Sequence, residues 1–329
     1  MGLYSSSSTW RSTTGRIAAA GMAMYAWIPR KACMKKKFRS KVRRIVSSVQ
    51  ERDGLLRTTS SKMLAFLGRN CGGPEGSRAV MFHIGRCGST VLGNMLDEEP
   101  GLYWDSEALY PRIGRVRMNP GILQAEHFDR ETYIREIRRR FVNAGQRRYG
   151  FELTYDHVHY FGITDPKEAR EILQSLGIGI FISLGRKNLL RQLISTIRGR
   201  QVGNMHIDAG DKKGLKMKPV DLDPAGFSLY KDDMPVPLEE HLAKRERWLE
   251  WNRQVVGEDG LHLDFETHVL QDPRVGYRLL CEHIGIQPQE LEPSLRRTNP
   301  EAVEKLLADP QAWRDRLSGT SYEWMMDAD

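Results

Sequence analysis

The fold class is decided by the stretch Ala79-Val80-Met81-Phe82-His83-Ile84-Gly85-Arg86-Cys87-Gly88-Ser89-Thr90. Its first six residues are largely apolar, which predicts a buried strand over residues 79–84. A turn with two glycines follows, and a helix is predicted from Ser89 to about Leu96. A strand that runs through a tight turn into a helix is the starting unit of an α/β fold.

The same alternation continues along the chain. The patterns predict strands over 101–104, 149–153, 178–184 and 261–265, and helices over 131–144, 165–177, 188–200, 238–256, 274–284 and 300–308. Asp165-Pro166 is a typical helix start, with Asp as N-cap and Pro in the first helical position. We therefore expect an α/β fold with a P-loop-like, doubly wound, mostly parallel sheet flanked by helices. Ligands of such sheets bind at the carboxyl ends of the strands.

Charge is distributed unevenly over the 329 residues. Residues 1–50 contain 11 Lys and Arg and no acidic residue, whereas the remainder has 39 basic and 42 acidic residues. The net charge of +8 therefore belongs to a tail, and the body is mildly acidic. We divide the chain into a basic, Ser-rich tail of residues 1–75, either disordered or a targeting segment, and an α/β domain of residues 76–329. No nucleic-acid partner is expected.

Several interpretations of the tail stay open. Ser5 to Ser8 and the arginines are typical of an organellar transit peptide, and the apolar run 17–28 fits an interfacial helix or a signal-peptide core. Met1-Gly2 fits the loose myristoylation pattern. The four cysteines form no CxxC pair, so a reducing compartment and a cytoplasmic location are the default. An organellar or membrane-associated location through residues 1–50, with a peripheral membrane contact, is the alternative.

The loop after the first strand has the composition of an anion site. A helix N-terminus offers backbone N–H groups and the positive end of its dipole, and Arg86 adds a bidentate cation. The nucleotide-triphosphate signature ending in Gly-Lys-Ser/Thr does not occur in the sequence. A Cys-based phosphatase would need an arginine six positions after Cys87, where Gly93 stands. Cys87 is therefore interpreted as a small loop residue.

This loop resembles that of sulfotransferases that use 3′-phosphoadenosine 5′-phosphosulfate (PAPS). Their 5′-phosphosulfate loop follows a strand and reads Pro-Lys/Arg-Ser-Gly-Thr/Ser-Thr. Gly85 replaces the Pro here, and Cys87 replaces the first Ser. The resemblance implies that the 5′-phosphosulfate is bound by Gly85, Arg86, Cys87, Gly88, Ser89 and Thr90.

A second segment is similar to the 3′-phosphate segment of bacterial carbohydrate sulfotransferases. It follows the strand 178–184 and runs Arg186-Lys187-Asn188-Leu189-Leu190-Arg191-Gln192-Leu193-Ile194-Ser195. The similarity implies that Arg186 and Ser195 bind the 3′-phosphate. A cation and a hydroxyl at the end of a neighbouring strand can reach the second phosphate of one nucleotide. Alone, the segment would read equally well as a basic, solvated helix face.

A third resemblance, to the tyrosylprotein sulfotransferases, concerns the general base. Met95-Leu96-Asp97, Pro100, Glu107 and Pro111-Arg112 follow their order and spacing, although Ser106 replaces the first acid of their Glu pair. It implies that Glu107 accepts the acceptor's proton, while Arg86 stabilises charge on the leaving phosphate.

His157 and His159 are the next candidates for a base. They would share one face of an extended segment and could line an acceptor pocket. No third ligand accompanies them, so no metal site is expected.

These observations predict a sulfotransferase with PAPS as co-substrate and no metal, acting on a hydroxyl or amine of a carbohydrate, lipid or small molecule. Two alternatives stay open: a P-loop kinase or phosphotransferase, and a nucleotide-binding module without catalysis. Acceptor specificity is expected in the segments 108–128 and 202–236, which lack periodicity.

Overall fold

The computed structural model describes residues 71–110, 128–202, 207–208, 217–229 and 234–328. Most of the tail assigned to residues 1–75 lies outside these ranges, as do Pro111 and Arg112 and much of the segment 202–236. No helix in the described part of the chain is long and apolar enough to cross a bilayer.

A five-stranded sheet forms the centre of the described domain. Its strands are β1 (Arg78–His83), β2 (Leu102–Glu107), β3 (Arg148–Thr154), β4 (Ile178–Gly185) and β6 (Leu261–Asp264). The order is β2-β3-β1-β4-β6, and every neighbouring pair is parallel. The central strand β1 is buried along its whole length, which explains its apolar composition. The predicted strand 261–265 corresponds to β6, at one edge of the sheet.

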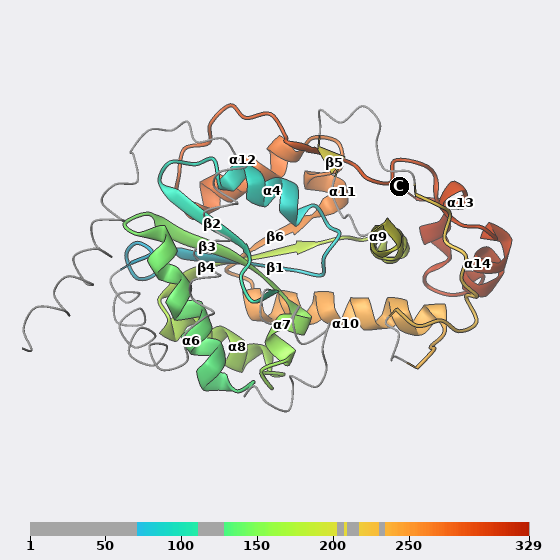
Figure 1. Ribbon diagram of the computed structural model, residues 1–329, viewed down its shortest axis with the longest axis horizontal. Helices are drawn as coiled ribbons and strands as arrows, with labels where there is room; N and C mark the ends of the chain where they lie inside the picture. The colour runs from blue at the N-terminus through green and yellow to red at the C-terminus, as the bar shows by residue number, and fades with distance from the viewer. Residues whose placement is uncertain (1–70, 111–127, 203–206, 209–216, 230–233, 329) are drawn as a thin grey trace, which may run out of the picture. The chain divides into compact units, whose positions relative to one another are not determined.

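Helices cover both faces of this sheet (Figure 1). One face packs around Met81 and Trp104, the other around Phe82 and Phe151. The helices of the first face are α4 (Ser89–Leu96) and α12 (Pro273–Ile284); those of the second are α6 (Arg130–Arg140), α8 (Pro166–Ser175) and α10 (Leu238–Val256). The doubly wound α/β fold predicted from the sequence is thereby confirmed.

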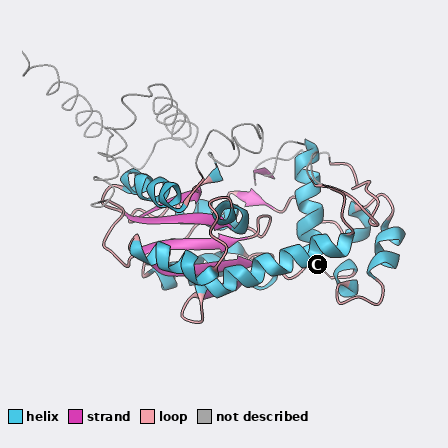
Figure 2. Cartoon of the chain, turned by 90° about the horizontal axis from the view of Figure 1, so that it is seen from below, coloured by secondary structure: helices cyan, strands magenta, loops and turns pink. Residues whose placement is uncertain are grey.

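A third apolar cluster lies beyond the carboxyl ends of the strands. It joins α9 (Leu189–Val202) to α13 (Val303–Leu306) and α14 (Pro310–Leu317). Figure 2 shows a group of helices beyond one end of the magenta strands. In Figure 1, α9 lies to the right of the arrowhead of β4, beyond the end of the strand. The shorter elements are η2 (Phe141–Ala144), α7 (Tyr155–His159), β5 (Ile207–Asp208), α11 (Phe265–His268), β7 (Leu295–Arg296) and η3 (Glu323–Met326). β5 and β7 form a separate antiparallel pair.

Three predicted elements differ by three or more residues at one end from their bounds in the structure, and α14 was not predicted. The strand 101–104 continues to Glu107 because Asp105, which breaks the apolar pattern, is paired with Arg140 and Tyr149. The helix 131–144 ends at Arg140 and tightens into a 3₁₀ turn. The helix 300–308 shrinks to Val303–Leu306, since the backbone on either side of Leu307 hydrogen-bonds to Val220 instead.

Candidate functional site

The loop between β1 and α4 turns through left-handed backbone. The angle φ is +75° at Gly85, +54° at Arg86 and +87° at Gly88. Arg86 is the non-glycine residue with positive φ in the described ranges, a conformation that costs about 1 kcal/mol. A Cβ atom on Gly88 would lie 2.7 Å from Val269 Cγ1, so this position also needs glycine for space. The first turn of α4 carries no acidic side chain that would compete with an anion.

Side chains from two neighbouring elements hold the carbonyl groups of this loop. Gln192 Nε2 donates to the carbonyl oxygens of Ile84 and Gly85, at 3.0 Å each. Arg245 on α10 donates from Nε to Gln192 Oε1 at 2.6 Å, which orients the amide. Arg186 Nη1 donates to the carbonyl oxygen of Arg86 at 3.0 Å. The strained turn is thus fixed from outside by α9, α10 and the end of β4.

The two segments predicted to bind the nucleotide's phosphates are in contact. Arg86 Nε donates to Ser195 Oγ at 3.0 Å, and Arg86 Nη2 donates to Thr298 Oγ1 at 3.2 Å. Ser195 is buried and lies on α9, which follows the strand β4 adjacent to β1. Three segments far apart in sequence therefore place a guanidinium group and two hydroxyl groups together at the carboxyl edge of the sheet.

Arg186 is buried, unlike a typical surface cation. Its guanidinium lies 4.4 Å from the ring centre of Phe265, and its Nε is 4.0 Å from Glu266 Oε1. Burial lowers the pKa of Arg186 to about 10, although Glu266 acts in the opposite direction. The carboxylate of Glu266 also accepts the backbone N–H groups of Lys187 and Asn188 at 3.0 Å each. Arg186 therefore supports the loop backbone directly, in addition to the phosphate role that the sequence predicts.

The other loop residues differ in how they face the site. Cys87 is fully buried in the core between the sheet, α4 and α12, in agreement with a small loop residue. Ser89 is also buried, whereas Thr90 is partly exposed. Cys87 can therefore contribute to a ligand site through its backbone alone.

Glu107, the predicted base, is the last residue of β2, and its side chain is 35% exposed. His157 Nε2 lies 3.8 Å from Glu107 Oε2, while the Thr154 N–H points to His157 Nδ1 at 3.5 Å. An acceptor role for Nδ1 places the ring proton on Nε2, toward the carboxylate. His157 is buried and lies at ion-pair distance from the more exposed Glu107.

The predicted shared face of His157 and His159 is wrong because the segment is helical, not extended. In α7 the two side chains diverge. The ring of His159 stacks on Tyr155 at 3.6 Å and lies 5.7 Å from Trp251. His159 therefore belongs to an aromatic cluster, and its burial there lowers the pKa of the ring, which favours the neutral form.

Thr298 and Gln192 are site residues that the motifs did not assign. Gln192 stands inside the quoted segment, but its role depends on the approach of the β1 loop and of Arg245. Thr298 is preceded by Arg296 and Arg297, a basic pair that could have drawn attention to it.

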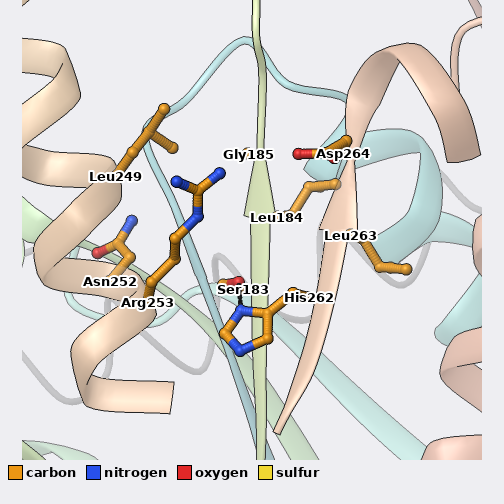
Figure 3. A pocket seen from close by; sticks show the side chains of 9 residues that line it. All are labelled: Ser183, Leu184, Gly185, Leu249, Asn252, Arg253, His262, Leu263 and Asp264. Atoms are coloured by element: carbon orange, nitrogen blue, oxygen red, sulfur yellow. Dashed lines mark hydrogen bonds between the residues drawn. The ribbon is translucent and has the colours of Figure 1, made fainter. Parts of the chain in front are cut away.

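Two pockets lie near this edge of the sheet. One, of about 70 Å³, lies between β4, β6 and α10; Ser183 Oγ and His262 Nδ1 are 2.7 Å apart on its wall (Figure 3). It is far smaller than the roughly 300–1,000 Å³ of small-molecule sites. The other, of about 400 Å³, is open and is lined by Tyr155, Glu246, Arg247, Glu250, Trp251 and Gln254. No residue of the 85–90 loop lines either pocket.

Known proteins offer little guidance to the identity of the chain. No protein-family model and no curated protein matches it. Among solved structures, a sulfotransferase from Alicyclobacillus acidocaldarius aligns with a TM-score of 0.39 and 14% identity, over 78% of this chain and 96% of that one.

Proposed function

We propose that this protein is a sulfotransferase that moves a sulfuryl group from PAPS to a hydroxyl or amine of a small acceptor. The observation that carries the proposal is the contact between Arg86 and Ser195. It joins the two segments that resemble the 5′-phosphosulfate and 3′-phosphate segments of this enzyme class. Both segments follow adjacent parallel strands, and the carboxyl ends of such strands are where these sheets bind nucleotides.

The donors at this edge fit a nucleotide with two separate anionic groups. Arg86, Ser195 and Thr298 contribute guanidinium and hydroxyl donors, and the N-terminus of α4 contributes backbone N–H groups. Arg186 lies behind the loop and donates to the carbonyl oxygen of Arg86, so its positive charge is fixed close to this group of donors. PAPS would supply the activated sulfuryl group.

The residues divide the chemistry between the two sides of the transferred sulfur. Glu107 accepts the proton of the acceptor's hydroxyl or amine as its oxygen or nitrogen bonds to sulfur. The electron pair of the broken S–O bond stays on the leaving phosphate oxygen. Arg86 and the α4 N-terminus stabilise this negative charge, an effect worth about 3 kcal/mol for one donor.

The test is transfer of radiolabelled sulfuryl from PAPS to a panel of sugars, lipids and small amines. Arg86→Ala should abolish transfer almost completely, and Arg86→Lys should restore part of it, because a lysine keeps the charge but loses the bidentate fork. Arg135, an exposed residue of α6, gives the control variant Arg135→Ala, which should be fully active. Wild-type transfer by Arg86→Ala would contradict the proposal. Consumption of ATP without PAPS would favour a kinase, and binding of 3′-phosphoadenosine 5′-phosphate without any turnover would favour a nucleotide-binding module.

A further inference from the structure

His83 lies directly beneath the loop, at the end of the central strand. It is fully buried, and its Nδ1 accepts a hydrogen bond from the backbone N–H of Gly85 at 3.0 Å. This contact turns the Gly85 N–H inward at the residue where the left-handed turn begins. No other side chain of β1 makes a hydrogen bond to the loop in the described part of the chain.

Glu152, on the neighbouring strand β3, faces the other nitrogen of this ring. Its Oε2 is 3.2 Å from His83 Nε2, and its Oε1 accepts a hydrogen bond from Trp104 Nε1 at 3.0 Å. The three side chains are at most 2% exposed, so water does not compete for these contacts. Trp104 thus occupies Oε1, and Oε2 is left to face His83 Nε2, which lies at ion-pair distance and has no hydrogen-bond partner within the described residues.

The two contacts of His83 define its tautomer. Because the Gly85 N–H points at Nδ1, that nitrogen carries no proton, and the ring proton is on Nε2, toward Glu152. Burial opposes a second proton, whereas Cys87 and Glu152 favour it and raise the pKa of His83. A second proton would have to sit on Nδ1, against the Gly85 N–H. The hydrogen bond and the doubly protonated ring therefore exclude each other, and the 3.0 Å contact identifies the neutral ring.

We propose that His83 and Glu152 are positioning residues: Glu152 holds His83 in the Nε2-protonated tautomer, and His83 Nδ1 fixes the Gly85 N–H and with it the left-handed turn at Gly85 and Arg86. The pair acts from inside the sheet, opposite to Gln192 and Arg186, which hold the carbonyl groups of the same turn from outside. Its effect on nucleotide binding rests on the proposed function, whereas its effect on the loop does not.

Two isosteric variants separate the two ring nitrogens. His83→Asn places an amide oxygen where Nδ1 is and keeps the acceptor for Gly85, whereas His83→Gln reproduces the Nε2 position and loses that acceptor. In the ligand-free protein, amide exchange of Gly85 should stay near the wild-type rate in His83→Asn and become roughly fivefold or more faster in His83→Gln. Circular dichroism and thermal unfolding identify which variants are folded. Equal exchange rates in two folded variants would overturn the proposal.

Glu152→Gln tests the tautomer without changing the shape of the side chain. Trp104 donates to Oε1, so the new amide must direct its N–H₂ group at His83 Nε2. The ring proton then moves to Nδ1 and opposes the Gly85 N–H, so we expect fast Gly85 exchange again. In a Trp104→Phe background the new amide can rotate by half a turn and present its oxygen to His83 Nε2. Glu152→Gln should then accelerate Gly85 exchange less. The nitrogen chemical shifts of His83 give an independent signature: a doubly protonated ring in the wild type would overturn the proposal.

Nucleotide affinity links the pair to the proposed function. The dissociation constant of 3′-phosphoadenosine 5′-phosphate should rise about tenfold in His83→Gln and Glu152→Gln and stay near the wild-type value in His83→Asn. If the wild type does not bind this nucleotide, the proposed function fails while the exchange and shift measurements still decide the role of the pair. If it binds and the three variants bind equally well, the positioning role is refuted.

Discussion

Glu107 is accessible to an acceptor and lies close to a buried histidine. It ends β2 with its carboxylate 35% exposed and 3.8 Å from the buried ring of His157. Glu107→Gln keeps the shape and removes the basicity, so we expect kcat to fall by about 10²–10⁴. Binding of 3′-phosphoadenosine 5′-phosphate should hardly change, since Glu107 is assigned to the acceptor side of sulfur.

The measurement is steady-state transfer from PAPS together with calorimetric binding. Glu98→Gln is the matched control, because Glu98 is an exposed carboxylate that precedes β2, at the opposite end of the strand from Glu107. If kcat of Glu107→Gln stays within a few-fold of the wild type, the base lies elsewhere and His157 becomes the next candidate. If nucleotide affinity falls as well, Glu107 supports the loop instead.

Local sequence revealed the residues whose role is set by the adjacent backbone. Gly85, Gly88 and Arg86 could be recognised because a strand, a tight turn and a helix follow one another in a few residues. Gln192, Thr298 and the His83–Glu152 pair could not, since each acts through a partner that the sheet brings from another segment.

At the scale of elements, one capping signal was used and is confirmed: Asp165-Pro166 predicts the start of α8. The pairs Asp272-Pro273 and Asp309-Pro310 start α12 and α14 in the same way, but they were not used, and α14 was not predicted. In each case the Asp side chain accepts a backbone N–H of the first turn. Elements whose residues are held by distant partners, such as the end of β2, were predicted too short.

The start of α9 depends on the last residues of the described chain. Asn188 Oδ1 accepts the Arg191 N–H at 2.9 Å, and Asn188 Nδ2 donates to the carbonyl oxygens of Met325 and Ala328 at 2.9 Å each. Asn188→Ser keeps an oxygen for the helix cap but cannot reach the two carbonyls. We expect it to cost about 2 kcal/mol of unfolding free energy, one for each lost hydrogen bond, and Asn188→Ala to cost about 1 kcal/mol more.

Chemical denaturation measures both costs, and amide exchange shows where they arise. Exchange should become faster in both variants for the amides of residues 325–328, and near Arg191 in the alanine variant alone. An Asn188→Ser protein as stable as the wild type would show that the C-terminal residues do not anchor α9. The contacts between Asn188 and the C-terminal residues matter for the candidate site because they fix the start of α9, which carries Gln192 and Ser195.

For the whole molecule, a buried histidine makes stability depend on pH. His241 is buried, its Nε2 is 2.9 Å from the carbonyl oxygen of Phe227, and its ring stacks on Phe227 at 4.2 Å. Burial lowers the pKa of His241 from its ordinary value of 6.5, and Arg245 acts in the same direction. Below that value the unfolded chain binds a proton that the folded chain refuses, so this contribution to stability is lost as the pH falls.

His241→Gln removes the titrating group and isolates this effect from other histidines. The variant should be less stable than the wild type at about pH 8, and the difference in unfolding free energy should shrink at about pH 5. Urea denaturation at the two values gives the comparison. A gap that widens in acid would mean that the folded state binds this proton more tightly than the unfolded chain.

The fold as a whole brings the proposed nucleotide site together from three segments, so ligand binding and global stability are linked. Arg86, Ser195 and Thr298 meet only when β1, β4 with α9, and the C-terminal part are assembled. A ligand that binds this junction binds the folded chain alone. At about 100 times its dissociation constant the ligand adds about 2.7 kcal/mol to the free energy of unfolding, which corresponds to a rise of roughly 5–10 °C in Tm.

3′-Phosphoadenosine 5′-phosphate should therefore raise Tm by this amount, and AMP, which lacks the 3′-phosphate, should raise it less at equal concentration. Ser195→Ala should narrow the difference between the two nucleotides, while Ser175→Ala, on the helix α8 that covers the sheet rather than its carboxyl edge, should leave it unchanged. Equal rises in Tm with both nucleotides in the wild type would show that α9 does not bind the 3′-phosphate.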